Sequence, residues 1–239
     1  MDMFKTHTKW KLLDHGYIKL VEYWGSDSSI IESARMSTNR GFRGWGTDNH
    51  PGDEVLLKYL YTHKHLSPFE MAGLIIEVKA PIFVFRQWHR HRTQSYNEMS
   101  ARYTTLPDES YIPSLDRLMI NASGTNKQAG TIKDSTALTT QNANLFRAEL
   151  ESMFKTQEHL YNTWLKLGIP KELARIHLPF ARYSKMRASA NLRNWLQFLT
   201  LRMDSNAQWE IRQYANAIYN LCLEIYPKTM NLFMSDVEK

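Results

Sequence analysis

Residues 71–92 constrain the fold of this chain more than any other stretch. The first ten of them alternate between apolar and polar side chains, as in a strand with one buried face. The apolar positions of that face are Ala72, Leu74, Ile76 and Val78. Pro81 then ends the strand and suits the first turn of a helix, and from residue 82 onward the apolar residues follow helical spacing. We therefore expect a half-buried strand that leads directly into a helix.

The predicted helix runs into a strongly polar segment, residues 90–103, which reads RHRTQSYNEMSARY. So many hydrogen-bonding side chains make a poor core and a good binding surface. Arginine binds phosphates and planar polar edges through its rigid fork of N–H donors. Arg90, His91 and Arg92 fall at the end of the helix and point to different sides, so they can contact different parts of one ligand, or two ligands. The segment predicts a site for a flat, anionic ligand, followed by a loop.

The first half of the chain predicts further elements around this unit. Residues 10–13 and 17–24 are strand-like and are separated by a turn, which indicates a hairpin. Ser28 or Ser29 could cap a helix that runs to Met36. Residues 38–52 contain several glycines without the spacing of a phosphate-binding loop, so we expect an ordinary flexible loop there. A helix is expected over 53–63, with helical spacing in Val55, Leu56, Tyr59 and Leu60.

The second half predicts helices after a polar stretch. Residues 121–144 are rich in Asn, Ser, Thr, Gly and Lys and indicate a flexible loop that could be a lid, a binding loop or disordered. Helices are expected over residues 145–167, 170–178, 191–202 and 206–226, the last stopped by Pro227. In that last helix Tyr214, Ile218, Leu221 and Ile225 form the apolar stripe. The loop does not divide domains, and all 239 residues are expected to form one domain.

Composition narrows the class of protein further. The net charge of +6 suits an anionic partner, but nucleic acid, an acidic membrane and phosphorylated small molecules all fit the charge alone. Cys222 is the only cysteine, so an intramolecular disulfide and a Cys-rich metal site are excluded. The first residues lack the apolar core of a signal peptide, and no apolar run is long enough to span a membrane. We expect a soluble, cytoplasmic protein that does not bind a membrane.

Two pairs of histidines raise the question of a metal site. His63 and His65 form one pair, and His89 and His91 form the other. A cation lies inside each pair, Lys64 in the first and Arg90 in the second, and would repel a divalent ion. We therefore expect no bound metal.

The polar segment has the pattern RHRxxSxNExSxRY, which resembles the signature of the flavin-dependent thymidylate synthases. Three further strings resemble segments of that family: HxSPFE from His65, ELARIHLP from Glu172, and NLRxxxxFLxLRxDSxAQWEIRxYA from Asn191. The resemblance covers roughly residues 10–230 and is broken mainly by the 121–144 loop. Two positions depart from the family pattern, because Gln197 and Asn206 stand where many members have Asn and His.

The resemblance implies an α+β fold, with a central, largely antiparallel sheet from the first half of the chain and long helices packed around it. It also implies a homotetramer in which each active site is built from several subunits. The implied reaction is the reductive methylation of dUMP to dTMP. The carbon would come from 5,10-methylenetetrahydrofolate, and FAD would carry hydride from NADPH.

Site residues are implied by the same resemblance. Arg202 would face the carbonyl edge of the pyrimidine and stabilise charge on the ring, and Ser100 is the second residue assigned to catalysis. The residues implied for dUMP binding are Gln87, Arg90, Glu98, Ser100, Arg102, Arg175 and Arg202, with Ser100 and Arg102 at the phosphate. The residues implied for FAD binding are Ser37, His65, Ser67, Arg90, His91, Arg92, Glu98, Asn191 and Arg193. A covalent role for Ser100 is disfavoured, because the sequence assures no histidine base beside it.

The single cysteine bears on the mechanism independently of the resemblance. Other thymidylate synthases attack the uracil ring with a thiolate, which needs an accessible, electropositive setting. Cys222 lies among apolar residues of a predicted helix and should pack as a small hydrophobe. We therefore expect a mechanism without a cysteine nucleophile.

Two other functions remain open at this stage. A nucleic-acid-binding protein would use the RHR triplet and the arginines of 175–202 as its contact face, with an affinity that falls steeply with salt. Asn97 and Glu98 are unusual in a stripe that only contacts phosphates, so no nucleic-acid partner is expected. The other alternative is a flavoprotein reductase that transfers no methyl group.

Overall fold

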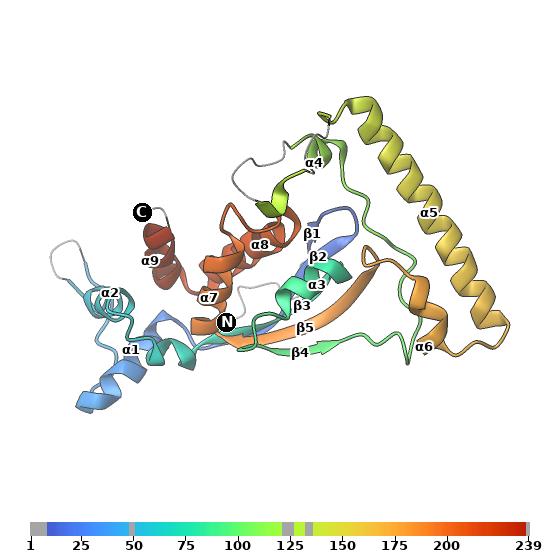
Figure 1. The fold of residues 1–239 in the computed structure, drawn as a ribbon. Coiled ribbons are helices and arrows are strands. Elements are labelled where there is room, and N and C mark those ends of the chain that lie inside the picture. Colours follow the sequence, from blue (N-terminus) through green and yellow to red (C-terminus); the bar gives the residue numbers. More distant parts are fainter. Residues whose placement is uncertain (1–8, 48–50, 121–126, 132–135, 238–239) are drawn as a thin grey trace.

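A five-stranded antiparallel sheet with the strand order β1-β2-β3-β5-β4 carries the fold (Figure 1). The computed structural model describes residues 9–47, 51–120, 127–131 and 136–237. The strands are β1 (Lys9–Leu12), β2 (Gly16–Trp24), β3 (Gly73–Pro81), β4 (Ser95–Glu98) and β5 (Tyr183–Asn191). The predicted hairpin at residues 10–24, the predicted strand before Pro81 and the α+β class with an antiparallel sheet are confirmed.

Strand β5 corrects the expectation that the sheet comes from the first half of the chain and that everything after the polar loop is helical. It pairs with β3 along its whole length, from Gly73 opposite Asn191 to Pro81 opposite Tyr183, and with β4 on its other edge. Its residues do alternate between buried and exposed. The buried positions are largely alanine and serine, which have low strand propensity, so the period of two was easily missed.

The polar segment is also more regular than expected. Helix α3 (Ile82–Trp88) ends at Trp88, four residues earlier than predicted. After a short turn the chain forms β4, which was predicted as a loop and pairs with β5 from Ser95 opposite Ser189 to Glu98 opposite Met186. The turn therefore lies at one end of β4, and Ser100 follows the other end.

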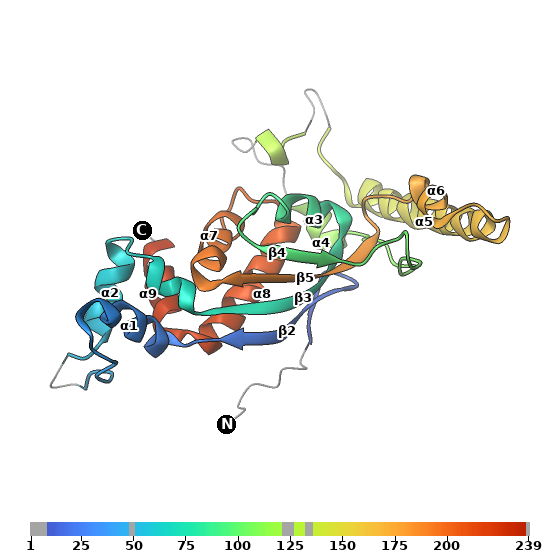
Figure 2. The same ribbon diagram turned by 90° about the horizontal axis from the view of Figure 1, so that it is seen from below.

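Helices α3, α7 (Leu192–Arg202) and α8 (Trp209–Ile225) cover one face of the sheet (Figures 1 and 2). Buried aromatic rings join them: Trp88 lies 4.7 Å from Phe198 and 6.3 Å from Tyr214, measured between ring centroids. Buried Trp195 donates its indole N–H to the carbonyl oxygen of Leu74 at 3.1 Å. These contacts fix the end of α3 and the whole of α7 against the sheet. The predicted apolar stripe of α8 is buried as expected.

The helices before β3 differ in detail from the prediction. Helix α1 (Asp27–Arg35) is capped by Ser26, not by Ser28 or Ser29, and is followed by a short 3-10 helix, η1 (Met36–Thr38). Helix α2 (Glu54–Thr62) was predicted correctly, but it buries Leu57 and Tyr61 while Tyr59 is exposed. A second 3-10 helix, η2 (Ser67–Met71), leads into β3.

The glycine-containing loop before α2 makes specific polar contacts with the start of that helix where the structure describes it. Buried Asp53 accepts a hydrogen bond from the backbone N–H of Arg43 at 2.7 Å and forms an ion pair with Arg35. Glu54 accepts from the backbone N–H of Gly46 at 2.8 Å, and this bond is the main reason that its pKa falls to about 2. The two carboxylates were visible in the sequence, but their backbone partners were not.

The long helix α5 (Thr140–Lys166) extends away from the sheet (Figure 1). It begins within the stretch predicted as a loop, of which residues 121–126 and 132–135 lie outside the described residues. The short elements that flank it are α4 (Leu115–Met119), η3 (Lys127–Ala129), α6 (Lys171–Ala174) and η4 (Arg175–His177). Several of its large apolar side chains are exposed, namely Leu145, Phe146, Met153, Leu160 and Trp164. Buried Arg182 links it to the start of β5 through an ion pair with Glu158 at 2.7 Å.

Helix α8 ends just before Pro227, as predicted, but Pro227 also begins a last helix, α9 (Pro227–Val237), which the sequence analysis missed. Asp27, at the start of α1, caps this helix from a distance. The carboxylate accepts from the backbone N–H groups of Lys228 at 2.9 Å and Thr229 at 3.1 Å, and from the Thr229 hydroxyl at 2.6 Å. Because the cap comes from the other end of the sequence, local signals could not show it.

Replacing Asp27 with alanine should lower the free energy of unfolding by about 2–3 kcal/mol, because a buried acceptor of three hydrogen bonds is lost. Urea unfolding followed by circular dichroism measures this. Asp236→Ala, which removes only an exposed ion pair with Lys64, is the control and should cost no more than about 0.5 kcal/mol. Equal losses in the two variants would show that Asp27 does not act as a cap.

Candidate active site

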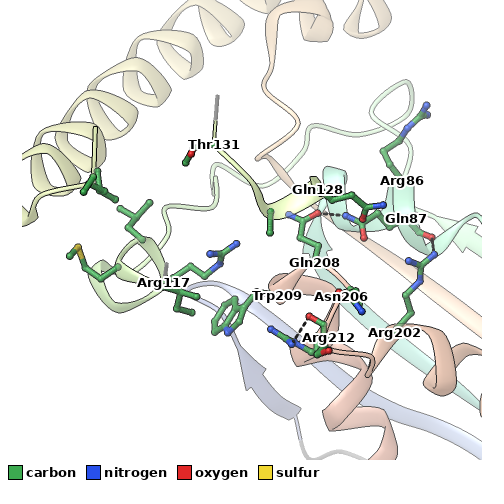
Figure 3. A pocket seen from close by; sticks show the side chains of 18 of the residues that line it. Arg86, Gln87, Arg117, Gln128, Thr131, Arg202, Asn206, Gln208, Trp209 and Arg212 are labelled. Atoms are coloured by element: carbon green, nitrogen blue, oxygen red, sulfur yellow. Dashed lines mark hydrogen bonds between the residues drawn. The ribbon is translucent and has the colours of Figure 1, made fainter. Parts of the chain in front are cut away.

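A cavity of about 1420 Å³ opens between the end of α3, the junction of α7 and α8, and residues of the stretches 117–120, 128–131 and 136–138 (Figure 3). Within the described residues, every charged side chain that lines it is an arginine: Arg86, Arg90, Arg117, Arg202 and Arg212. Gln87, Gln208 and Trp209 add amide groups and an aromatic ring to the same wall. Such a lining suits a ligand with phosphate or carboxylate groups and a planar polar ring.

Arg202, the predicted catalytic residue, lies at the last turn of α7 and is half-buried at the cavity wall. Its Nε donates to Nε2 of His91 at 2.8 Å, and its Nη2 donates to the backbone carbonyl oxygen of Gln87 at 3.0 Å. Two N–H groups of Arg202 thus fix the orientation of the guanidinium group. Its other N–H groups are not used in these two bonds. Burial, and then the charge of Arg90, lowers the pKa of Arg202.

His91 serves as the acceptor that orients Arg202. It is buried, and its ring packs against Phe198 with 4.8 Å between ring centroids. Burial, and then the charge of Arg202, lowers its pKa from 6.5 to about 4. The imidazole is therefore neutral at pH 7, and because Nε2 accepts from Arg202, its proton sits on Nδ1.

The low pKa of His91 predicts a pH dependence of stability. In the unfolded chain His91 takes up a proton below about pH 6.5, whereas in the folded chain it does so only near pH 4. Its contribution to stability is thus complete above pH 6.5 and is lost as the pH falls toward 4. We expect a loss of about 1–2 kcal/mol after allowance for solvent screening. His91→Gln, which keeps an acceptor but cannot titrate, should flatten this part of the curve.

Urea unfolding at pH 7 and pH 4.5 measures the effect. The control is His63→Gln, which changes an exposed histidine at the end of α2. If the wild type and His91→Gln lose the same stability between the two pH values, His91 is not the group responsible.

Gln87 and Arg90, both predicted to bind the nucleotide, lie at this cavity as expected. The Gln87 amide nitrogen donates to the side-chain oxygen of Gln208, which belongs to the junction before α8 (Figure 3). Asn206, one of the two departures from the family pattern, also lines the cavity, whereas Gln197 is exposed on α7.

A second group of predicted residues lies at the other end of β4, away from the cavity. Ser100 accepts a hydrogen bond from the backbone N–H of Arg102 at 3.3 Å. The guanidinium group of Arg102 pairs with Glu172 of α6 at 2.9 Å, and Arg175 begins η4 directly after that helix. The four residues of β4 separate this group from the turn at Arg90 by roughly 13 Å. Within one chain, therefore, the predicted phosphate-binding residues do not face Arg202.

Some of the residues predicted for the flavin lie near the start of α7, and others lie elsewhere in the chain. Asn191 caps α7 by accepting from the backbone N–H of Asn194 at 3.0 Å, and Arg193 pairs with Glu70 of η2, the helix that Ser67 begins. The Asn194 amide donates to the carbonyl oxygen of Thr93, which brings the turn that contains exposed Arg92 beside α7. The other predicted residues, Ser37, His65 and Glu98, are exposed on η1, after α2 and at the end of β4.

The donor set of these residues suits a flavin dinucleotide. Arg92, Arg193, His65 and Ser67 are all exposed and can donate hydrogen bonds, as a diphosphate and a ribityl chain require. His91, the residue before exposed Arg92, accepts from Arg202 at the cavity wall. The RHR turn thus links Arg92 to the arginine-rich cavity.

Cys222 is fully buried in α8. Burial raises the pKa of its thiol, so the thiolate is strongly disfavoured. In the part of the chain that the structure describes, we find no cluster of three or more histidine, cysteine, aspartate or glutamate side chains that could hold a metal ion. None of the described helices is long and apolar enough to cross a membrane.

The sequence analysis missed Arg117, Gln208 and Trp209 as cavity residues. Arg117 comes from α4, within a part of the chain that gave no motif, and its guanidinium carbon lies 5.5 Å from the centre of the Trp209 ring. Gln208 and Trp209 stood within the AQWEIR string, so that string was the available signal. No sequence motif near Arg117 linked this residue to the AQWEIR string.

Comparisons with known proteins agree with this geometry. A family model described as "Thymidylate synthase complementing protein" matches residues 19–228. The flavin-dependent thymidylate synthase of Thermosipho africanus is 39% identical over 226 residues, covering 95% of this chain and 94% of that relative. The enzyme of the same name from Anaplasma marginale is 42% identical over 219 residues, covering 90% of this chain and 70% of that relative.

Solved structures show the same fold. A UMP/dUMP methylase, PolB from Streptomyces cacaoi, bound with 5-Br UMP, superposes with a TM-score of 0.80 at 28% identity, covering 94% of this chain and 96% of that chain. The same methylase bound with 5-Br dUMP gives a TM-score of 0.79 at 29% identity, covering 95% and 97%. The chain is thus similar in sequence and in fold to enzymes that methylate a uracil nucleotide.

Proposed function

Because this chain belongs to the flavin-dependent thymidylate synthase family, we propose that it converts dUMP to dTMP by reductive methylation. The methylene carbon comes from 5,10-methylenetetrahydrofolate, and NADPH supplies the reducing equivalents through FAD. One domain, comprising the whole chain, carries this activity. The observation that best supports the proposal is Arg202, which neutral His91 holds at the wall of an arginine-rich cavity next to the RHR motif.

Arg202 is proposed to act on the pyrimidine ring. With Nε and one Nη donor fixed by His91 and Gln87, the rest of the guanidinium group can donate to a carbonyl oxygen of the uracil. Such a donor stabilises negative charge that develops on the ring as the new carbon–carbon bond forms. Because His91 is neutral, Arg202 is the charged member of this pair. A protonated imidazole would repel Arg202 and could not accept its hydrogen bond.

The nucleotide phosphate is proposed to bind at Ser100, Arg102 and Arg175. Arg102 pairs with Glu172 of α6, and Arg175 begins η4 directly after that helix. Ser100 acts there as a hydrogen-bond donor and not as a nucleophile. Gln87, Arg90 and Glu98 complete the contacts to dUMP.

FAD is proposed to bind along the side formed by Ser37, His65, Ser67, Arg92, Asn191 and Arg193, with Arg90, His91 and Glu98 between it and the nucleotide. When bound there, FAD would supply the hydride that reduces the transferred carbon to a methyl group. The chain's own part is to bind the diphosphate through exposed arginine, histidine and serine donors.

No thiol takes part in the proposed mechanism, and this predicts that Cys222→Ala retains activity. Cys222 is fully buried, so the substitution leaves a small void in α8 and removes no group that faces the cavity. The rate of dTMP formation should stay within about threefold of wild type when measured below the unfolding temperature, because only packing changes. A variant that is folded, binds dUMP and forms no dTMP would restore a cysteine mechanism.

The enzyme is proposed to act as a homotetramer with shared active sites. Two observations support this. The exposed apolar side chains of α5, among them Phe146 and Trp164, are suited to burial against another subunit. The phosphate-binding group near Arg102 lies apart from the Arg202 cavity within one chain, so a complete site needs groups from a second chain.

An absorbance spectrum of the purified protein tests the proposed function. The protein should show the visible absorbance bands expected of a bound flavin. Addition of dUMP should perturb these bands, and NADPH should bleach them. A protein that stays colourless with added FAD, or whose flavin bands ignore dUMP, would contradict the proposal.

UMP is the second candidate substrate. The superposed methylase is described as acting on UMP and dUMP and was solved with bromo analogues of both. Parallel titrations with UMP and dUMP, followed by an assay for the 5-methylated product of each, distinguish the two. Preference for UMP would change the substrate but not the reaction.

A further inference from the structure

A buried carboxylate lies behind the cavity wall and has no part in the proposed mechanism. Glu210 is in the first turn of α8, is only 3% exposed and does not line the cavity. Its Oε1 accepts from the Tyr111 hydroxyl at 3.1 Å and from Nε of Arg117 at 2.7 Å, and its Oε2 accepts from the Gln208 amide at 2.9 Å. Three donors from three different parts of the chain thus meet on one side chain.

These bonds continue to the predicted catalytic arginine. The side-chain oxygen of Gln208 accepts from the Gln87 amide, and the backbone carbonyl oxygen of Gln87 accepts from Arg202. The path joins α4, α8, α3 and α7 without a gap. Glu210 is the one carboxylate in it, and it bonds to Arg117 on one side of the cavity and, through Gln208, to Gln87 on the other. Figure 3 shows Arg117, Gln208 and Gln87 around the cavity.

Only an ionised carboxylate satisfies all three donors at this position. A tyrosine hydroxyl, a guanidinium N–H and an amide N–H each need an acceptor, and a carboxylate is the side chain that only accepts. The charge is compensated by Arg117, whose guanidinium carbon also lies over the Trp209 ring at 5.5 Å. A glutamine here would have the same shape but would present an N–H group to one of the donors.

We propose that Glu210 is a positioning residue that fixes Gln208, and through it Gln87, on one wall of the nucleotide site and Arg117 on the other. This rests on the proposed function, since it takes the cavity to be the site of a uracil nucleotide. The role differs from general stabilisation, because the residues it fixes face the ligand.

Glu210→Gln tests the proposal, with Glu224→Gln, an exposed carboxylate on the same helix, as the matched control. The dissociation constant for dUMP, measured by titration of the FAD-loaded protein, should rise at least about tenfold, the effect of losing one charge-assisted hydrogen bond. The dissociation constant for FAD should stay within about twofold of wild type, because the side chains that bond to Glu210 and Gln208 are not among those proposed for FAD. Glu224→Gln should change neither value.

A double variant, Glu210→Gln with Gln208→Glu, provides the rescue. The amide at position 210 can then donate to the carboxylate at position 208, which still accepts from Gln87, and the oxygen at position 210 still accepts from Arg117 and Tyr111. We expect this pair to return Gln87 and Arg117 to their wild-type positions in a crystal structure, which is the readout because the new carboxylate at position 208 lines the cavity and repels an anionic nucleotide. If Glu210 served stability alone, affinities for dUMP and FAD in Glu210→Gln would fall together with the unfolding temperature, and the swap would not restore these positions.

Crystal structures of wild type and Glu210→Gln without nucleotide decide the point independently of what the protein binds. We expect Gln208, Gln87 or Arg117 to leave its wild-type position in the variant. If all three stay in place, or if dUMP binds to Glu210→Gln as to wild type, the inference is overturned. A wild-type protein that does not bind dUMP would contradict the proposed function, while the two structures would still decide the role of Glu210.

Discussion

Arg202→Ala is expected to lower kcat/KM for dUMP at least about 10³-fold while the protein stays folded and binds FAD. The reason is geometric, since Arg202 is fixed by His91 and by the Gln87 carbonyl so that its remaining donors face the cavity. Alanine removes both the ring contact and the positive charge. Initial rates of dTMP formation measure the loss, and the flavin absorbance of the same samples reports the folded state.

Two further variants separate position from charge. Arg202→Lys keeps the charge but lacks the planar fork, so it cannot hold His91, the Gln87 carbonyl and the ring together and should remain nearly inactive. Arg86→Ala removes the same charge from an exposed residue of the same cavity and should cost less than about fivefold. If Arg202→Ala and Arg86→Ala lose activity equally, Arg202 contributes only to the general field of the cavity.

Two inactive variants should regain activity when they are mixed in one assembly. In the proposed homotetramer, Arg202 comes from one chain and Arg102 from another, so neither Arg202→Ala nor Arg102→Ala alone leaves a complete site. Coexpression in equal amounts should place the two intact residues together in about a quarter of the sites. The mixed protein should thus recover about a quarter of wild-type activity, against near-zero activity for each parent.

The matched control pairs two residues of the same cavity. Arg202→Ala mixed with Arg90→Ala should not recover, because both side chains line one cavity within one chain. Size-exclusion chromatography with light scattering verifies that mixed assemblies have formed. If the Arg202 and Arg102 variants remain inactive in mixed tetramers, the active sites are not shared in the proposed way.

The parts of the fold that depend on local pattern could be predicted from the sequence. The alternation before Pro81 and the stripe from Tyr214 to Ile225 each place large apolar residues on one face, and both faces are buried. Strand β5 was not predicted, because its buried face includes small residues such as Ala188. Its place in the sheet also depends on pairing with residues more than 100 positions away. Helix α9 was not predicted, because its cap, Asp27, lies 201 residues from Lys228 in the sequence.

In the candidate active site, too, local sequence patterns could be predicted and long-range contacts could not. The motif and the other matched strings predicted site residues, and the structure brings four of them, Gln87, Arg90, His91 and Arg202, close together. The residues that hold them could not be predicted, because Arg117 and Glu210 are 93 positions apart and meet only in the folded chain. A sequence motif indicates which side chains suit a ligand. The hydrogen bonds that hold those side chains, such as those of Glu210, depend on how distant parts of the chain pack.

The most direct test of the account is a single assay of the purified protein with dUMP, NADPH and 5,10-methylenetetrahydrofolate labelled in its methylene carbon, with and without FAD. We expect labelled dTMP to form only when FAD is present, and to form equally well with Cys222→Ala. Labelled dTMP that forms without any flavin, or a folded, FAD-loaded protein that oxidises NADPH but leaves dUMP unmethylated, would contradict the account.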